Sequence, residues 1–424
     1  MDFKCHLKAT GDFLRTYRSF WYDEILNYYP EIESNFNQDW IEYLDGVSNR
    51  DLWKIDGRAA DANIQNRSFK AFFDKITELC QLPKNLENIG VEYPARCFTR
   101  VKGKKKHEIG VLGNTVGALE NKYQFSHAVD IGGGVGHLSR IISHYHGLKT
   151  KTLDKDLVLQ ETGKSKLDRY RVPENAKSVE FIPMTFGQVP EASLREIFTD
   201  QALSIGLHTC GPLAVAHLET AIKHGSKALL NFGCCYTKLN PLTDCNISSQ
   251  AKADPITFTK YGLTLATRGH CEISYQDFQL KERVKAYRYS FHLLLWYRFG
   301  IQEFRPVGDS HPRDYWGSFS DYASNKLRAL EIAGREKITP AELNSFFADT
   351  KVQKEVRKMF LANIIRWQAG RVVEHYLLTD RALFLEERGY QVSLKEYFDQ
   401  SISPRNIGIL ALAPGITDPT MESI

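Results

Sequence analysis

Short runs that are rich in apolar or β-branched residues alternate with helical patterns through the middle of the chain. The runs are four to six residues long and lie at 128–131, 148–153, 179–182, 202–207 and 228–232. Between them, apolar residues recur every three or four positions, as they do on one face of a helix. Strands that alternate with helices form a parallel sheet with helices on both faces. The pattern therefore predicts an α/β fold in which these five runs are parallel strands.

The chain before this region has a helical pattern. Phe69, Phe72 and Ile76 recur at helical spacing and predict a helix with one buried face. Aromatic stripes of this kind are core material more often than binding surface. We interpret residues 1–92 as a helical N-terminal cap.

The helical pattern returns after the fifth run. Val284, Tyr287 and Phe291 predict one long helix. The sequence Thr-Pro-Ala-Glu at 339–342 predicts the start of another, because it combines a capping box with proline at the first helical position. We interpret residues 241–388 as a helical insertion.

Two β-rich segments lie near the end of the chain, at 391–398 and 407–413, and a polar link joins them. Two such segments with a polar connection predict a β-hairpin. The predicted organisation is then a first part of the α/β core at 93–240, the insertion, and a closing hairpin with a C-terminal tail at 389–424.

A glycine-rich turn follows the first run. It begins at Asp130 and has glycines at 132, 134 and 136, which let the backbone turn sharply and lie close to a ligand. A phosphate-binding loop would need a Lys-Ser/Thr pair after the glycines, and this chain has His-Leu-Ser. A dinucleotide fingerprint would place its third glycine at position 137, which is His137. Both of these common motifs are therefore excluded.

The remaining pattern, Asp-x-Gly-x-Gly-x-Gly, resembles the first motif of class I S-adenosylmethionine-dependent methyltransferases. The resemblance implies a Rossmann-like sheet and S-adenosylmethionine as cofactor. It implies that Asp130 faces the cationic methionine end and that Gly132, Gly134 and Gly136 admit the cofactor. The alternative is a tight strand-to-helix turn that binds nothing.

Two further residues match positions that contact the cofactor in class I methyltransferases. Asp154 ends the second run, 24 positions after Asp130 (154 − 130), and suits the carboxylate that binds the ribose hydroxyls. Asp156 is the competing candidate for this role. Thr185 follows the third run and is expected near the adenine.

The fourth and fifth runs lead into His-Thr-Cys-Gly and Gly-Cys-Cys-Tyr. Ligands bind beyond the carboxyl ends of parallel strands, so both segments should share one crevice with the glycine turn. Methyl transfer mainly requires alignment of donor and acceptor, and a hydroxyl acceptor also needs a base. We predict His208 as that base and Tyr236 beside the transferred methyl group. A purely structural role for His208 is the alternative.

The cysteines of these two segments, Cys210, Cys234 and Cys235, are expected to lie near the substrate. Together with His208 they resemble a zinc ligand set. However, adjacent cysteines seldom bind one ion together, and no Cys-x-x-Cys pair occurs in the sequence. We therefore expect no metal.

A basic run precedes the first strand. It contains Arg100, Lys102, Lys104, Lys105 and Lys106. A charge run is usually a solvated face. This run leads into the helix that lies by the cofactor mouth in class I methyltransferases. We predict substrate contacts at Lys104, Lys105, Lys106 and His107, and at Arg405 in the hairpin link.

The composition is that of a globular protein. With 42% hydrophobic residues, the 424-residue chain has ample material for a core, and a net charge of +4 permits an anionic partner without requiring one. Eight cysteines do not form a secreted disulfide pattern. The sequence starts without a signal-peptide pattern, and no apolar run reaches the roughly 18 residues of a membrane span. We therefore predict a cytoplasmic protein that does not associate with membranes.

Five segments together resemble the methyltransferase-like protein 25 family. They are Lys-Lys-Lys-His-Glu-Ile (104–109), Val-Asp-Ile-Gly-Gly-Gly-Val-Gly-His-Leu-Ser (129–139), Gly-Leu-His-Thr-Cys-Gly (206–211), Phe-Gly-Cys-Cys-Tyr (232–236) and Ser-Pro-Arg-Asn (403–406). One departure is Pro212, which stands where the family pattern has an acid that would orient the substrate.

The resemblance implies a methyltransferase and leaves the acceptor open. A family of tRNA ribose methyltransferases has a similar His-x-Cys-Gly and Cys-Cys arrangement, which favours RNA. The Asn-Pro-Pro-Tyr motif of base-amino methyltransferases is absent, because the fourth strand leads into His-Thr-Cys-Gly. A protein or a small molecule is the alternative acceptor. A non-catalytic scaffold is the alternative of another class.

Overall fold

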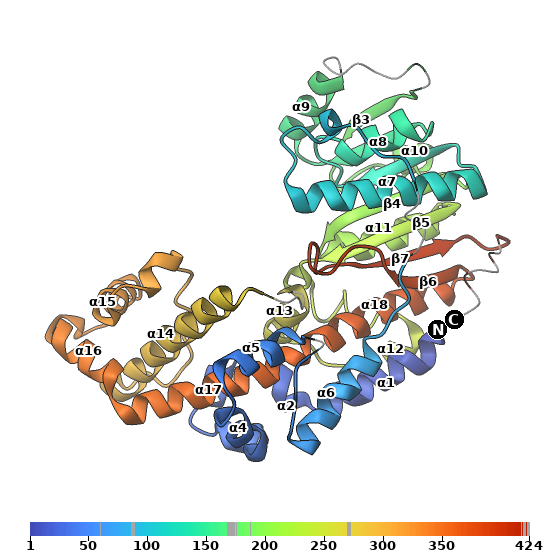
Figure 1. Ribbon diagram of the computed structural model, residues 1–424. Coiled ribbons are helices and arrows are strands. Elements are labelled where there is room, and N and C mark those ends of the chain that lie inside the picture. Colours follow the sequence, from blue (N-terminus) through green and yellow to red (C-terminus); the bar gives the residue numbers. More distant parts are fainter. Residues whose placement is uncertain are drawn as a thin grey trace. The chain divides into compact units, whose positions relative to one another are not determined.

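Seven strands form one sheet in the order β3-β2-β1-β4-β5-β7-β6 (Figure 1). The strands are β1 (His127–Ile131), β2 (Thr150–Asp154), β3 (Val179–Pro183), β4 (Ala202–Cys210), β5 (Ala228–Cys234), β6 (Gln391–Glu396) and β7 (Ile407–Leu412). Strands β1 to β5 are parallel, and β7 is antiparallel to both β5 and β6. The predicted strands, the closing hairpin and the Rossmann-like sheet of class I methyltransferases are confirmed.

The structure is a computed structural model. It describes residues 1–59, 61–85, 90–167, 174, 176–186, 188–268, 273–416, 418 and 421. The chain divides into two compact units. Unit 1 comprises Met1–Arg15, Leu79–Gly269 and Arg371–Ile424, and unit 2 comprises Thr16–Glu78 and His270–Gly370. Among the described helices, none has the length and apolar character that a membrane span needs.

The helices of unit 1 are α1 (Phe3–Thr16), α7 (Gly103–Tyr123), α8 (His137–Tyr145), α9 (Leu157–Leu167), α10 (Glu191–Ile197), α11 (Pro212–Lys223), α12 (Ser249–Ala253), α13 (Lys260–Arg268) and α18 (Gly370–Glu386). Of these, α8, α9 and α11 pack against the strands of the sheet. Successive residues of β1 point to opposite faces. Val129 packs with Leu153 in one core, and Ala128 packs with Ile141 of α8 in another. Burial on both faces explains why β1 and β5 consist mainly of apolar residues.

Strand β4 continues three residues beyond the predicted run, through His208, Thr209 and Cys210. Its pairing with β5 is interrupted by a bulge between Leu207 and Thr209. His208 is the extra residue and has φ +59°. The segment that we expected beyond the strand therefore lies within it, because pairing resumes after the bulge. The bulge also redirects the His208 side chain, as bulges next to functional sites often do.

The N-terminus of α11 accounts for Pro212. Proline stands at the first position of this helix, and Gly211 precedes it with φ +58° and ψ −125°. The first helical position lacks an intrahelical N–H partner, so proline fits there without losing a hydrogen bond. Pro212 is thus consistent with the start of α11.

Unit 2 is helical. Its helices are α2 (Arg18–Trp21), α3 (Ile32–Asn35), α4 (Gln38–Asp45), α5 (Asn49–Gly57), α6 (Arg67–Leu79), α14 (Tyr275–Phe299), α15 (Phe319–Ala329), α16 (Pro340–Ala348) and α17 (Thr350–Gln368). Tyr287 and Phe291 of α14 belong to a buried cluster with Tyr322 and Leu343. The predicted capping box begins α16, where the hydroxyl of Thr339 accepts from the N–H of Glu342.

Candidate functional site

The glycine turn joins β1 to α8 at the carboxyl edge of the sheet. Gly132 and Gly134 have φ of +71° and +57°, a region that residues with a Cβ rarely adopt. Gly132 is exposed, and a Cβ there would meet only Leu213, at 3.9 Å. The space beside this turn is therefore open to a ligand, and a larger side chain would extend into it.

Asp154 at the end of β2 binds this turn directly. Its Oδ2 accepts a hydrogen bond of 2.9 Å from the N–H of Gly134, and its Oδ1 accepts one of 2.9 Å from the N–H of Asp156. Asp156 accepts from the N–H groups of Val158 and Leu159 at the start of α9. The carboxylate of Asp156 is thus used to cap a helix, and Asp154 is the acid that adjoins the glycine turn.

Asp130 is buried beneath the turn. Its Oδ2 accepts a hydrogen bond of 2.6 Å from the hydroxyl of Ser139, and only 2% of the residue is exposed. Burial raises the pKa of Asp130 to about 6, although the bond from Ser139 lowers it. A carboxylate in this position favours a cation nearby because water does not solvate its charge.

The other two predicted cofactor residues differ in their surroundings. Gly136 is buried, and a Cβ there would come within 2.9 Å of the Phe181 ring. Close packing against Phe181 is thus sufficient to require glycine at this position. Thr185 is exposed just beyond β3. Their cofactor contacts remain predictions.

Three exposed apolar side chains follow Asp154. Leu157, Val158 and Leu159 at the start of α9 are 61%, 73% and 39% exposed. A Cβ on Gly134 would lie 3.7 Å from Leu159, so this apolar patch adjoins the glycine turn. Leu157, Val158 and Leu159 were not among the predicted site residues, although three consecutive apolar residues after a strand-ending acid are a signal in the sequence.

These features fit S-adenosylmethionine. A nucleoside with a cationic side chain needs open space at a backbone turn, an acid for the ribose hydroxyls, an apolar surface for the base and a negative charge near the sulfonium. Gly132, Asp154, the Leu157–Leu159 patch and Asp130 are suited to these requirements in that order. When bound, the cofactor would supply the activated methyl group.

The predicted base is hydrogen-bonded to an acid that the sequence analysis did not select. Nε2 of His208 lies 2.8 Å from Oε2 of Glu108 in α7. Oε1 of Glu108 accepts a 2.6 Å hydrogen bond from the hydroxyl of Ser403, and Nζ of Lys104 lies 3.6 Å from it. Burial raises the pKa of Glu108, but hydrogen bonds from His208 and Ser403 outweigh burial and leave the pKa below its usual value.

The charge state of Glu108 determines the tautomer of His208. An ionised carboxylate can only accept hydrogen bonds, so Nε2 of His208 is the donor. A neutral imidazole has one N–H, and Nδ1 is then the nitrogen that can accept a proton. His208 is 28% exposed in its side chain, whereas Glu108 is 1% exposed. The pair therefore combines an accessible imidazole with a buried acid that orients it.

A buried polar cluster lies behind the bulge. Nε2 of His217 in α11 lies 3.0 Å from the hydroxyl of Ser204, and its Nδ1 lies 2.9 Å from Nδ2 of Asn231. The same Nδ2 donates a 3.2 Å hydrogen bond to the hydroxyl of Thr209. Burial lowers the pKa of His217 to about 3. This cluster links α11, β4 and β5 and fixes Thr209, the residue after His208.

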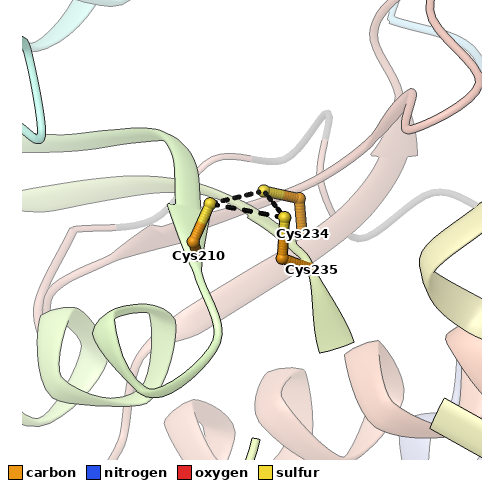
Figure 2. Close-up of side chains that lie close together, drawn as sticks. All are labelled: Cys210, Cys234 and Cys235. Carbon is orange, nitrogen blue, oxygen red and sulfur yellow. Dashed lines mark hydrogen bonds between the residues drawn. The ribbon is translucent and has the colours of Figure 1, made fainter. Parts of the chain in front are cut away.

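The three predicted cysteines are brought together (Figure 2). The sulfur of Cys210 lies 3.3 Å from that of Cys234 and 3.5 Å from that of Cys235, and the latter two are 3.7 Å apart. The contact with Cys234 lowers the pKa of Cys210 to about 5, despite partial burial, and the same contact raises the pKa of Cys234. The three thiols form one cluster at the carboxyl ends of β4 and β5.

Tyr236 is placed differently from the prediction. It is fully buried, and its hydroxyl donates a 3.2 Å hydrogen bond to Oε1 of Glu374. Sequence position alone suggested that Tyr236 would reach the crevice beside His208. A buried hydroxyl that is bonded to a carboxylate is not presented to a substrate, so this geometry favours a structural part for Tyr236.

The predicted substrate residues of the basic run lie at the start of α7, and they differ in exposure. Lys105 and Lys106 are exposed, and Lys104 is half-buried near Glu108. Nε2 of His107 accepts a 3.1 Å hydrogen bond from the N–H of Asp399 in the link between β6 and β7. In the same link, Nε of Arg405 donates to the carbonyl of Thr267.

A comparison with protein families identifies the class of domain that contains these residues. Residues 104–241 match a family model described as a methyltransferase domain. The match begins in α7 and ends shortly after β5, so it includes the glycine turn, Asp154, the Glu108–His208 pair and the cysteine cluster. This part of the chain is therefore similar to a methyltransferase domain.

One solved structure that matches this chain is also that of a methyltransferase. Coclaurine N-methyltransferase, in a crystal structure bound to N-methylheliamine and SAH, is 11% identical, and the match covers 95% of this chain and 99% of that one. The TM-score is 0.25. At this level the match says nothing about the chemistry of this chain.

Proposed function

We propose that this protein transfers a methyl group from S-adenosylmethionine, which binds at the glycine turn. The observation that carries the proposal is the hydrogen bond from Gly134 to Asp154 at an open turn, inside residues that match a methyltransferase domain. Asp154 binds the ribose, Asp130 faces the cationic end of the cofactor, and the Leu157–Leu159 patch contacts the adenine.

In this proposal His208 removes the proton of the acceptor. Glu108 orients its ring and keeps Nδ1 free of a proton. The thiol cluster and the basic residues at the start of α7 lie on the acceptor side. The five segments that resemble the methyltransferase-like protein 25 family include most of these residues, which supports a place in that family.

For the acceptor we propose RNA. The support is the exposure of Lys105 and Lys106 beside the Glu108–His208 pair, since exposed lysines suit phosphate groups. A protein or small-molecule acceptor is the competing proposal, and the modest net charge of +4 is compatible with it. A scaffold without catalysis would have no use for an oriented imidazole.

Two measurements test the proposed function. Titration calorimetry of the purified chain should show saturable binding of S-adenosylmethionine and of its demethylated product. Labelled methyl groups should then pass from S-adenosylmethionine to an extract of cells that lack the protein, and nuclease or protease treatment identifies the acceptor class. No binding would refute the proposal, whereas binding without transfer to any fraction would favour the scaffold.

A further inference from the structure

The sulfurs of Cys210, Cys234 and Cys235 lie on the same side of the strand ends, which regular strand geometry would not produce. Successive side chains on a strand point to opposite faces, so Cys234 and Cys235 should diverge. Cys235 instead has φ +53° and ψ +49°, and its sulfur lies 3.7 Å from that of Cys234. The left-handed residue thus brings both sulfurs to the same side.

A second irregularity brings the third sulfur to the same place. The bulge in β4, with φ +59° at His208, restores pairing so that Cys210 lies directly opposite Cys234. His208 and Cys235 are both non-glycine residues in a conformation that costs free energy. Such residues collect at functional sites, where the surrounding structure holds them in place.

We propose that Cys210, Cys234 and Cys235 bind one zinc ion through their three sulfurs. A tetrahedral zinc with Zn–S bonds of about 2.3 Å separates its sulfur ligands by about 3.8 Å. The observed separations of 3.3, 3.5 and 3.7 Å require each sulfur to move only a few tenths of an ångström. A disulfide would instead need one pair to close to about 2.05 Å and would leave the third thiol out.

The charges around the cluster suit this ligand set. Zinc with three thiolates carries one net negative charge. The ammonium of Lys238 favours the thiolate of Cys210. The ammonium of Lys238 therefore offsets part of this negative charge.

Three ligands leave one coordination position of the zinc for a ligand from outside the cluster. Within the described part of the chain, the metal-binding group consists of the three cysteines. Zinc sites with three protein ligands and one exchangeable position are typical of catalysis, whereas structural sites have four. This proposal goes beyond the methyltransferase function and does not depend on it. The sequence expectation of no metal rested on the rarity of adjacent cysteines that bind one ion and on the absence of a Cys-x-x-Cys pair.

The first experiment measures bound metal in the full chain, expressed without a metal-binding tag in zinc-supplemented medium. Elemental analysis should find one zinc per chain in the wild type and far less in Cys210→Ser and Cys235→Ser. Cys245→Ser is the matched control, because Cys245 is also a buried thiol and lies outside the cluster. Cys5→Ser removes an exposed thiol and tests for adventitious binding. Both controls should retain the zinc.

The second experiment compares the zinc affinity of the wild-type chain with that of Cys235→Ser. Competition with a chromophoric chelator should show zinc affinity more than about 100-fold weaker in Cys235→Ser, since even residues that merely support a ligand cost 10–100-fold. Alkylation followed by peptide mass spectrometry needs no variant. Zinc should protect Cys210, Cys234 and Cys235 in the folded wild type and leave Cys5 reactive.

Three results would each overturn the proposal. The first is equal zinc content in wild type and Cys210→Ser. The second is equal alkylation of the three cysteines with and without zinc, and the third is a disulfide between two of them in protein purified under reducing conditions. If the wild-type chain contains zinc but does not bind S-adenosylmethionine, the proposed function is refuted and the zinc proposal is not affected.

Discussion

Nε2 of His208 lies 2.8 Å from Oε2 of Glu108, although the two residues are 100 positions apart in the sequence. The bulge in β4 turns the imidazole toward α7, and the buried carboxylate receives its N–H. The pair resembles the oriented base of many enzymes, in which an acid fixes the tautomer of a histidine. We therefore predict different losses of methyl transfer when His208 and Glu108 are replaced.

Replacing His208 by alanine should lower methyl transfer by about 100-fold or more, because a positioned base contributes roughly 10²–10⁴. Glu108→Gln should lower it less, by about 10-fold, since the ring remains but its tautomer is no longer fixed. Both variants should bind S-adenosylmethionine as the wild type does, which calorimetry can check. A parallel loss of binding and rate would place His208 against the cofactor, and full activity would make the pair structural.

The glycine turn should not tolerate a large side chain at position 134. Gly134→Trp should abolish S-adenosylmethionine binding by filling the space between the turn and Leu159. Gly225→Trp is the matched control, because Gly225 also has positive φ, at +68°, and has no neighbour within 4 Å of a Cβ. Each variant should lose about 1–2 kcal/mol of stability from the strained backbone. Undiminished affinity in Gly134→Trp would contradict the assignment.

Asp130 should make the protein less stable as the pH rises. Burial raises its folded pKa to about 6 from a usual value of 3.8. Its contribution to stability is therefore complete below pH 3.8 and is lost as the pH rises through about 6. Asp130→Asn should raise the free energy of unfolding of the ligand-free protein by about 1–3 kcal/mol at pH 7.5, and much less at pH 4.5.

The same Asp130→Asn variant should bind S-adenosylmethionine at least about 10-fold more weakly, since a cation near a buried carboxylate is worth more than one pKa unit. Asparagine can still accept the hydrogen bond from Ser139, so the turn itself should remain. A variant that is stabilised equally at both pH values, with unchanged affinity, would show that the charge of Asp130 has no part in the site.

For His217 we predict the opposite dependence of stability on pH. Burial lowers its folded pKa to about 3 from 6.5. Its contribution to stability is complete above pH 6.5 and is lost as the pH falls toward 3, at up to about 1.4 kcal/mol per pH unit. Hydrogen exchange of the β4 and β5 amides, corrected for its intrinsic pH dependence, should show this loss between pH 6.5 and 5. His217→Gln should remove the pH dependence, and an unchanged slope would contradict the prediction.

The sequence predicted the sheet well because β1 and β5 are buried along their whole length and the other parallel strands keep apolar or β-branched residues between helical patterns. It also predicted the start of α16 from Thr339 and Glu342, whose interaction is local. The candidate site was predicted only in part. Asp130, Asp154 and the glycines lie close together along the chain or follow successive strands, so the topology alone brings them together.

The remaining features depend on long-range geometry. Glu108 was not selected because nothing in its neighbourhood shows that His208 will reach it. Tyr236 was placed beside the methyl group, whereas its hydroxyl is bonded to Glu374, 138 positions later. The cysteine cluster depends on a bulge and on a left-handed residue. The residues with positive φ at these two irregularities, His208 and Cys235, are neither glycine nor proline.

The acceptor prediction concerns the lysines at the start of α7. If the acceptor is RNA, replacing Lys104, Lys105 and Lys106 by alanine should weaken RNA binding and flatten its salt dependence. Each phosphate contact contributes roughly 0.7 to the slope of log affinity against log salt for single strands, so three contacts should lower the slope by about 2. Fluorescence anisotropy with a labelled RNA at several salt concentrations measures both quantities.

The matched control for this triple variant replaces Lys149, Lys177 and Lys223, which are also exposed and remove the same charge. They precede β2 and β3 or end α11, at the amino edge of the parallel strands, so they lie away from the glycine turn. Retained binding and slope in the control, with loss in the Lys104/Lys105/Lys106 variant, would locate the RNA beside the Glu108–His208 pair. Equal loss in both variants would indicate non-specific attraction, and no loss in either would favour a protein acceptor, because uncharged peptide contacts release few counterions.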